Sequence, residues 1–327
     1  MTVRRPIHAV FFLATIATWG PAVSSLEAQE AQATDVHLDT GTGTLSGTLL
    51  VPANTPPVPV VLIIAGSGPT DRDGNSAMLP GKNNSNRLLA AALASHGIAS
   101  LRYDKRGIGA SAAAMTSEAT LRFDTYVDDA AKWVRQLRTD PRFSTITVIG
   151  HSEGSLIGMI AARIAGADGY VTIAGPARNA ADVLRDQLRP AVPPDLFQQA
   201  DSILGELEAG RTVASPPPSL ASLFRPSVQP YIISWFRYRP ATELARLTIP
   251  VLIIQGTTDI QVPVDEATAL HAATPGAQLV VIDGMNHVLK DVPADQAAHV
   301  ASYSDSTLAL NARLVAAIVG FIGHVAR

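Results

Sequence analysis

The sequence predicts an α/β fold in which a mostly parallel central sheet is flanked by helices. Three observations predict it. Apolar, β-branched runs recur at 58–64, 146–149 and 250–255, and such runs are typical of parallel strands buried on both faces. Segments with apolar residues at helical spacing alternate with them. Of the 327 residues, 47% are apolar and only 16% are charged, which is enough to build a large core.

The elements are expected in a regular order along the chain. Alternating apolar residues over 35–52 predict an antiparallel hairpin at the sheet edge. The strands expected after it lie at 58–64, 98–103, 146–149, 170–174, 250–255 and 279–282. The expected helices lie at 84–96, 124–138, 156–162, 265–273 and 310–325. Gly97 ends the first helix, because glycine readily adopts the left-handed conformation that closes a helix.

The alternation of strands and helices stops before the strand at 250–255. The interval contains helical patches, one of them over 195–208, and a cluster of aromatic residues. An insertion of this length is either a functional lid or a linker, and its apolar content favours a folded lid. We therefore expect a helical cap over 178–244, inserted into a core formed by 34–177 and 245–327.

The N-terminus has the order of a secretory signal peptide. Two arginines precede an apolar stretch over 7–23, and small and polar residues follow, ending in Ala31-Gln32-Ala33. This order predicts a signal peptide over 1–33, cleaved after Ala33 or after Ala28. The stretch is short and interrupted for a membrane span. We therefore expect a periplasmic or secreted protein with no stable membrane insertion after cleavage.

Composition excludes several function classes. The formal net charge is −3, so there is no basic field to hold nucleic acid. The absence of cysteine excludes disulfides, thiolate catalysis and cysteine-bound metal. No H-E-x-x-H or comparable cluster occurs, so metal-dependent hydrolysis is not expected. A G-x-G-x-x-A pattern at 107–112 formally fits a dinucleotide site, but no acid follows at the strand end that such a site uses.

The motif Gly150-His151-Ser152-Glu153-Gly154 is the most informative part of the chain. It fits G-x-S-x-G and lies between a predicted strand and a predicted helix, the context in which the serine becomes a nucleophile. The sharp turn strains the serine backbone, and the glycines leave room for closely packed neighbours. We expect Ser152 to be a nucleophile and the side chain of His151 to point away from the attack line.

A serine hydroxyl needs a base that accepts its proton. In folds with this turn, the acid and then the base follow the nucleophile along the chain. Asp259 and His287 fit, because each directly follows a predicted strand and so lies at the same sheet edge as Ser152. We expect His287 to act as the base and Asp259 to orient it, with Asp283 as the alternative acid.

The oxyanion that forms during acyl transfer needs hydrogen-bond donors. One is expected to be the backbone N–H of Glu153, the residue after the nucleophile. The second is expected in the glycine-rich loop over 66–75, which follows the first parallel strand. We expect the N–H of Ser67 to be this donor, with that of Gly68 as the alternative.

These motifs together resemble the α/β-hydrolase superfamily and, within it, bacterial serine esterases. The resemblance rests on the elbow at 150–154, on Ala65-Gly66-Ser67-Gly68-Pro69, on Gln255-Gly256-Thr257-Thr258-Asp259 and on the segment 104–109. It extends from about residue 47 to the C-terminus. It implies a carboxylesterase that cleaves small acyl esters through an acyl-enzyme and needs no cofactor. Ala65 stands where many esterases carry a histidine before the oxyanion glycine.

Other interpretations remain open at this stage. Peptidases, thioesterases and acyltransferases share the fold that the resemblance implies. A non-enzymatic binding protein on the same scaffold is a remote alternative, because all three catalytic residue types are present. Tyr231, Trp235 and Phe236 either line an apolar substrate pocket or form the core of the cap.

The remaining histidines and several cations are expected at the surface. His96 is expected at a helix end, and His271, His299 and His324 on helix surfaces. Arg72, Arg106 and Lys290 either bind an acidic group of a substrate or are solvated, and solvation is the expectation.

Overall fold

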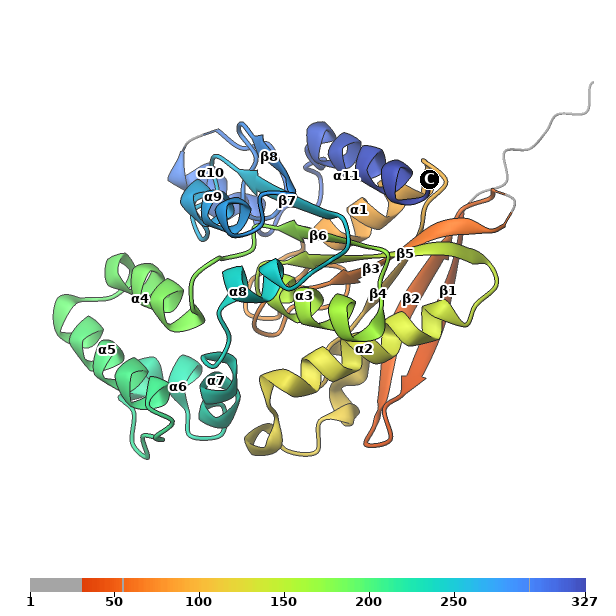
Figure 1. Cartoon of the computed structure of the whole chain (residues 1–327). Helices are drawn as coiled ribbons and strands as arrows, with labels where there is room; N and C mark the ends of the chain where they lie inside the picture. Colours follow the sequence, from red (N-terminus) through yellow and green to blue (C-terminus); the bar gives the residue numbers. More distant parts are fainter. Residues whose placement is uncertain (1–30, 55, 294) are drawn as a thin grey trace, which may run out of the picture.

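The computed structural model describes residues 31–327 except residues 55 and 294, so the predicted signal peptide lies almost entirely outside the described residues. One sheet contains eight strands in the order β1-β2-β4-β3-β5-β6-β7-β8 (Figure 1). β2 pairs antiparallel with β1 and with β4, and the other neighbouring pairs are parallel. The predicted edge hairpin and mostly parallel sheet are therefore confirmed. The strands are β1 Gln32–Asp39, β2 Thr44–Val51, β3 Val58–Ile64, β4 Ala99–Tyr103, β5 Phe143–His151, β6 Gly169–Ile173, β7 Val251–Gly256 and β8 Gln278–Ile282.

Helices cover both faces of the sheet (Figure 1). α1 and α11 cover one face, and α2 and α3 cover the other. These helices lie within a few residues of the expected positions, whereas α10 was not expected from the sequence. The helices outside the segment between β6 and β7 are α1 Ser85–Ala94, α2 Phe123–Arg138, α3 Glu153–Ala165, α9 Val264–Ala273, α10 Gln296–Ser302 and α11 Ala312–Val325.

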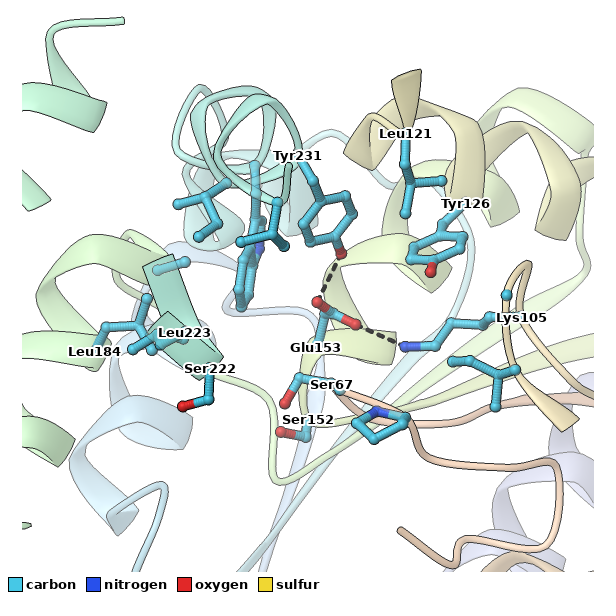
Figure 2. Close-up of a pocket in the computed structure, with 18 of the residues that line it drawn as sticks. Ser67, Lys105, Leu121, Tyr126, Ser152, Glu153, Leu184, Ser222, Leu223 and Tyr231 are labelled. Atoms are coloured by element: carbon cyan, nitrogen blue, oxygen red, sulfur yellow. Dashed lines mark hydrogen bonds and ion pairs between the residues drawn. The ribbon is translucent and has the colours of Figure 1, made fainter. Parts of the chain in front are cut away.

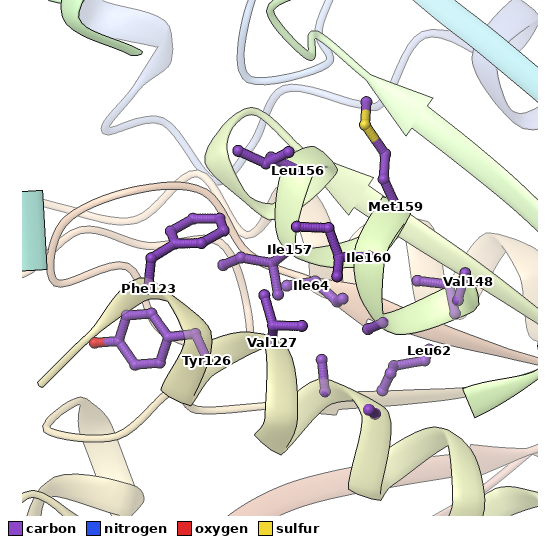
Figure 3. Close-up of a cluster of buried hydrophobic side chains, with 14 of the residues drawn as sticks. Leu62, Ile64, Phe123, Tyr126, Val127, Val148, Leu156, Ile157, Met159 and Ile160 are labelled. Carbon is purple, nitrogen blue, oxygen red and sulfur yellow. The ribbon is translucent and has the colours of Figure 1, made fainter. Parts of the chain in front are cut away.

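The sheet separates two apolar cores, and β3 contributes to both. Leu62 and Ile64 pack toward α2 and α3, in the cluster shown in Figure 3. Val61 and Ile63, the alternate residues, pack toward α1 and α11. Successive side chains of a strand point to opposite faces, so a strand buried on both sides needs an apolar residue at nearly every position. This requirement explains the continuous apolar runs in the sequence.

The segment between β6 and β7 is helical. We call residues 178–244 the cap segment; its helices are α4 Ala180–Ala191, α5 Pro194–Glu208, α6 Ala221–Phe224, α7 Gln229–Trp235 and α8 Pro240–Ala245. The cap segment packs on α2, where the backbone N–H of Phe123 donates to Ser234 Oγ over 2.8 Å. The Phe123 ring also lies parallel to the indole of Trp235, with ring centroids 6.0 Å apart. Over the described part of the chain, no helix has both the length and the hydropathy of a bilayer-spanning segment.

Candidate active site

Ser152 lies at a sharp turn between β5 and α3. Its backbone has φ 55° and ψ −121°, a conformation that is strained for a residue with a side chain. The turn is held because the Ser152 N–H donates to the carbonyl oxygen of Ile173 in β6 over 3.0 Å. The turn therefore presents the serine at the carboxyl edge of the parallel strands, where the sequence places it.

The two glycines of the motif permit this turn because backbone atoms of neighbouring segments pack directly against them. A Cβ atom on Gly150 would overlap the carbonyl oxygen of Gly154, and a Cβ atom on Gly154 would overlap that of Ile64 in β3. These overlaps involve backbone atoms, which cannot move aside as the end of a flexible side chain can. Both positions therefore require glycine for steric reasons, as the motif predicts.

Asp259 and His287 form a buried pair. The Nδ1 atom of His287 lies 2.8 Å from Oδ2 of Asp259, and the two side chains are 6% and 1% exposed. Oδ1 of Asp259 accepts hydrogen bonds from the backbone N–H groups of Gln261 and Val262, and Oδ2 accepts one from the Gln255 side chain. Burial tends to raise the pKa of Asp259, but His287 and these backbone donors outweigh it and leave the pKa below its usual value.

The alternative acid occupies a different environment. Asp283 is exposed and its Oδ1 accepts a hydrogen bond from the hydroxyl of Thr257. The structure therefore joins His287 to Asp259 rather than to Asp283.

His287 lies next to the nucleophile turn through its contacts with His151. The ring centroids of the two histidines are 4.7 Å apart, and His151 Nε2 donates to the His287 carbonyl oxygen over 2.8 Å. Because Nδ1 of His287 faces Asp259, Nε2 is the nitrogen available to a serine hydroxyl. Among the described residues, no hydrogen bond joins Ser152 Oγ to His287; such contacts often tighten only when substrate binds.

Ser67 and Glu153, whose backbone N–H groups are the expected oxyanion donors, line the same cavity as Ser152. Gly66 packs directly on the nucleophile, since a Cβ there would lie 3.3 Å from the Cβ of Ser152. This contact brings the loop that contains Ser67 and Gly68 alongside the elbow. Across the described residues, neither the Ser67 N–H nor the Glu153 N–H has a hydrogen-bond acceptor. Both donors are therefore available to a substrate oxygen.

A cavity of about 590 Å³ opens above Ser152, between the sheet edge and the cap segment (Figure 2). Ser67, Gly68 and Glu153 line it together with Ser152. Much of the remaining wall is aliphatic and includes Leu121, Val183, Leu184, Leu223, Val228 and Ile232. The site therefore combines the candidate nucleophile Ser152 with an apolar cavity.

The three aromatic candidates of the cap segment occupy different environments. Tyr231 and Trp235 line the cavity. Phe236 does not belong to the cavity wall; it is 8% exposed and packs in the core cluster. Trp235, the preceding residue, lines the cavity. Successive residues of a helix point in different directions, which explains why Phe236 does not line it as well.

Several residues that were expected at the surface are buried or half-buried. Arg106 forms an ion pair with Asp129 over 2.6 Å, and Arg72 forms one with Asp104 over 2.8 Å. Lys290 is fully buried, and its Nζ donates to two backbone carbonyl oxygens. His299 is only 3% exposed, His271 is half-buried, and His96 and His324 are exposed as expected. For Arg106, Arg72 and Lys290 the expectation was wrong because a partner compensates the burial of the charge. His299 is buried although its Nδ1 has no hydrogen-bond partner among the described residues.

One residue near the nucleophile was not identified from the sequence. Lys105 follows β4, lines the cavity and contacts Glu153. Its position directly after a buried strand is the signal that could have located it at the same sheet edge. Within the described residues, no group of three or more His, Asp or Glu side chains is arranged to hold a metal ion.

The chain belongs to the alpha/beta hydrolase family, whose sequence profile matches residues 61–301. It is 31% identical over 249 residues to esterase EstD of Thermotoga maritima, a match that covers 75% of this chain and 58% of that relative. It also resembles the structure of Est1E from Butyrivibrio proteoclasticus, with a TM-score of 0.57, 18% identity and coverage of 89% and 98% of the two chains. Esterase Pf2001 of Pyrococcus furiosus has a TM-score of 0.55, 16% identity and coverage of 91% and 94%. These structural likenesses show the shared fold.

Proposed function

We propose that the protein is a serine hydrolase that cleaves carboxylic esters through an acyl-enzyme. The observation that supports this most strongly is the strained turn at Ser152, beside the buried Asp259–His287 pair and two unbonded backbone N–H groups. The name of the relative EstD supports an ester substrate.

The proposed reaction has two steps. Ser152 Oγ attacks the carbonyl carbon of the ester while Nε2 of His287 accepts the hydroxyl proton. The negative charge on the carbonyl oxygen is stabilised by the N–H groups of Ser67 and Glu153. His287 then donates its proton to the leaving alcohol, which departs. Water, activated by the same imidazole, attacks the acyl-enzyme and releases the acid. Asp259 stabilises the imidazolium in both steps.

The cavity supports a substrate that is neutral and has a substantial apolar part. A volume of about 590 Å³ lies in the range that holds drug-sized ligands. Each charged side chain of the wall already has an ion-pair partner: Lys105 with Glu153, Arg106 with Asp129, and Arg225 with Glu118. No wall cation is therefore free to bind a substrate carboxylate.

A panel of matched substrates tests the proposal. Purified protein is given p-nitrophenyl esters of increasing acyl length, the matching thioesters and aminoacyl p-nitroanilides. We expect the highest kcat/KM on an ester, and we expect Ser152→Ala to lower its kcat by about a millionfold, the scale of nucleophile loss in other serine hydrolases. Asp283→Asn serves as the control and is expected to keep the activity. A faster thioester or anilide would change the substrate class, and an active Ser152→Ala variant would exclude the mechanism.

We also propose that the protein is exported and that the leader is removed after Ala28. Gln32 and Ala33 pair with Val51 and Leu50 in the edge hairpin, so cleavage after Ala33 would remove part of β1. The intact mass of the protein recovered from the periplasm or medium is expected to match a chain that begins at Gln29. A mass that includes residue 1, or a cytoplasmic location, would contradict the proposal.

A further inference from the structure

A chain of polar contacts runs along the cavity wall beside the nucleophile (Figure 2). Nζ of Lys105 donates to Oε2 of Glu153 over 2.7 Å and to the carbonyl oxygen of Gly66 over 2.6 Å. The other oxygen of Glu153 accepts a hydrogen bond from the hydroxyl of Tyr231 over 2.7 Å. The ammonium also lies 5.1 Å from the centre of the Tyr126 ring. Five separate segments, including helix α7 of the cap segment, therefore meet at one ion pair.

The ion pair is almost completely removed from solvent. The side chains of Lys105 and Glu153 are 1% and 4% exposed. Burying two charges costs free energy that their attraction recovers only in good geometry, and well-packed apolar residues are often as stable in such places. The pair is therefore poorly explained by stability alone, and its location next to the nucleophile indicates a role in the reaction.

The contact with Gly66 fixes the direction of a proposed oxyanion donor. The carbonyl oxygen of Gly66 and the N–H of Ser67 belong to the same peptide unit, and this peptide bond is trans. In a planar trans peptide the C=O and the N–H point in opposite directions. When Lys105 holds the carbonyl oxygen on one side, the Ser67 N–H must point to the other side. A rotated peptide would place a carbonyl oxygen where the donor belongs.

The contact with Glu153 removes an unfavourable charge. Glu153 carries the second proposed donor on its backbone and a carboxylate on its side chain. A bare carboxylate there would repel the negative charge that develops on the substrate oxygen, and in a site with little water this repulsion is strong. The ammonium of Lys105 neutralises the carboxylate, so the backbone N–H can act without opposition from its own side chain.

We propose that Lys105 is a positioning residue of the oxyanion hole, which orients the Gly66–Ser67 peptide and neutralises the Glu153 carboxylate. Tyr231 binds the same carboxylate from α7, so the cap segment is tied to this arrangement. The proposal rests on the proposed hydrolase mechanism. It adds a role for the ion pair between Lys105 and Glu153, which the proposed roles of Ser152, Asp259 and His287 do not include.

Three variants separate the two effects of Lys105. Lys105→Met leaves the Glu153 carboxylate without its cation, Glu153→Gln keeps the lysine on Gly66, and the double variant removes both charges. Asp129→Asn is the matched control, because it breaks the neighbouring buried ion pair with Arg106 without touching Gly66 or Glu153. Each variant is measured for kcat and KM on the ester that the wild type cleaves fastest. The inhibition constant of an aryl trifluoromethyl ketone is measured as well, because Ser152 adds to this ketone and forms a tetrahedral alkoxide that needs the oxyanion hole.

We expect Lys105→Met to lower kcat by about a hundredfold and to raise the inhibition constant of the trifluoromethyl ketone in parallel. KM should change by less than about threefold. The double variant should regain about tenfold in kcat over Lys105→Met, because the unpaired carboxylate is gone. It should stay about tenfold below Glu153→Gln, because Gly66 is no longer held. Titration of the active sites with a fluorophosphonate corrects each rate for the folded fraction. Asp129→Asn is expected to lower the Tm with kcat within about threefold of the wild type.

Clear outcomes would overturn the proposal. If Lys105→Met keeps its affinity for the trifluoromethyl ketone, or loses only active sites and not kcat per site, Lys105 has a structural role alone. If Lys105→Met does not fold, equal kcat values for Glu153→Gln and the double variant would lead to the same conclusion. A wild-type protein that neither hydrolyses esters nor reacts with the fluorophosphonate would instead refute the proposed function itself.

Discussion

At the scale of single residues, His151 contacts the proposed base His287 and directly precedes the proposed nucleophile Ser152. The sequence predicts that its side chain points away from the attack line, and in the structure its Nε2 donates to the carbonyl oxygen of His287. Burial, together with the adjacent imidazole of His287, lowers the pKa of His151 from 6.5 to about 3. His151 is therefore neutral at neutral pH, and no second cation forms beside the base.

This lowered pKa makes the stability of the fold depend on pH. An unfolded chain protonates His151 near pH 6.5, whereas the folded chain does so only near pH 3. The contribution of His151 to stability is thus fully present above pH 6.5 and is lost as the pH falls, by up to about 1.4 kcal/mol per pH unit. Urea unfolding of the wild type and His151→Gln at pH 7 and at about pH 5 checks this. Between pH 7 and about pH 5 we expect the wild type to lose more free energy of unfolding than His151→Gln, whose amide N–H can still donate to His287. Equal losses would contradict the lowered pKa of His151.

The sequence predicted some residues of the site better than others. Asp259 and His287 could be located because strand ends in a parallel sheet share one edge, and the structure pairs them. Lys105 was missed because a lysine is normally solvated, and only the three-dimensional packing places Glu153 and Gly66 within its reach. The carbonyl of Gly66 carries no sequence signal for such a contact.

At the scale of the elements, the strands were predictable with their bounds to within a few residues, whereas for the cap segment the sequence indicated helical character but not the bounds of most of its helices. The strands are buried on both faces, so their composition alone identifies them. In the cap segment only α4 and α5 are long enough to show an amphipathic pattern. α6, α7 and α8 are too short to be stable in isolation and depend on packing against α2 and on one another. α10, with seven residues, was missed for the same reason.

The junction of β5, α3 and β3 is the element contact on which the nucleophile turn depends. Gly154 lies against the carbonyl oxygens of Ile64 and Ala65, where a methyl group has no space. Gly154→Ala should therefore lower the free energy of unfolding by about 1–3 kcal/mol, as overpacking does elsewhere. Gly323→Ala is the matched control, since nothing lies within 4 Å of its added Cβ on α11. It should be neutral or stabilising by up to about 1 kcal/mol. Similar thermal unfolding of both variants would contradict the steric explanation.

At the scale of the whole molecule, the carboxyl edge of the parallel sheet gathers the site. The loop over 66–75, which is proposed to supply an oxyanion donor, follows β3, Ser152 follows β5, Asp259 follows β7 and His287 follows β8. The chain therefore collects residues that are far apart in sequence at one edge, as open α/β sheets do in general. The cap segment closes the apolar cavity over this edge and is joined to the core at Phe123, Glu118 and Glu153.

The central claim is that Ser152 is a nucleophile activated by His287, and its reaction with a fluorophosphonate tests this most directly. The serine oxygen displaces fluoride from phosphorus, and peptide mass spectrometry locates the adduct. We predict one adduct per chain, on Ser152, with a labelling rate that falls at least about a thousandfold in His287→Ala. An adduct on another residue, or a rate that does not depend on residue 287, would contradict the account.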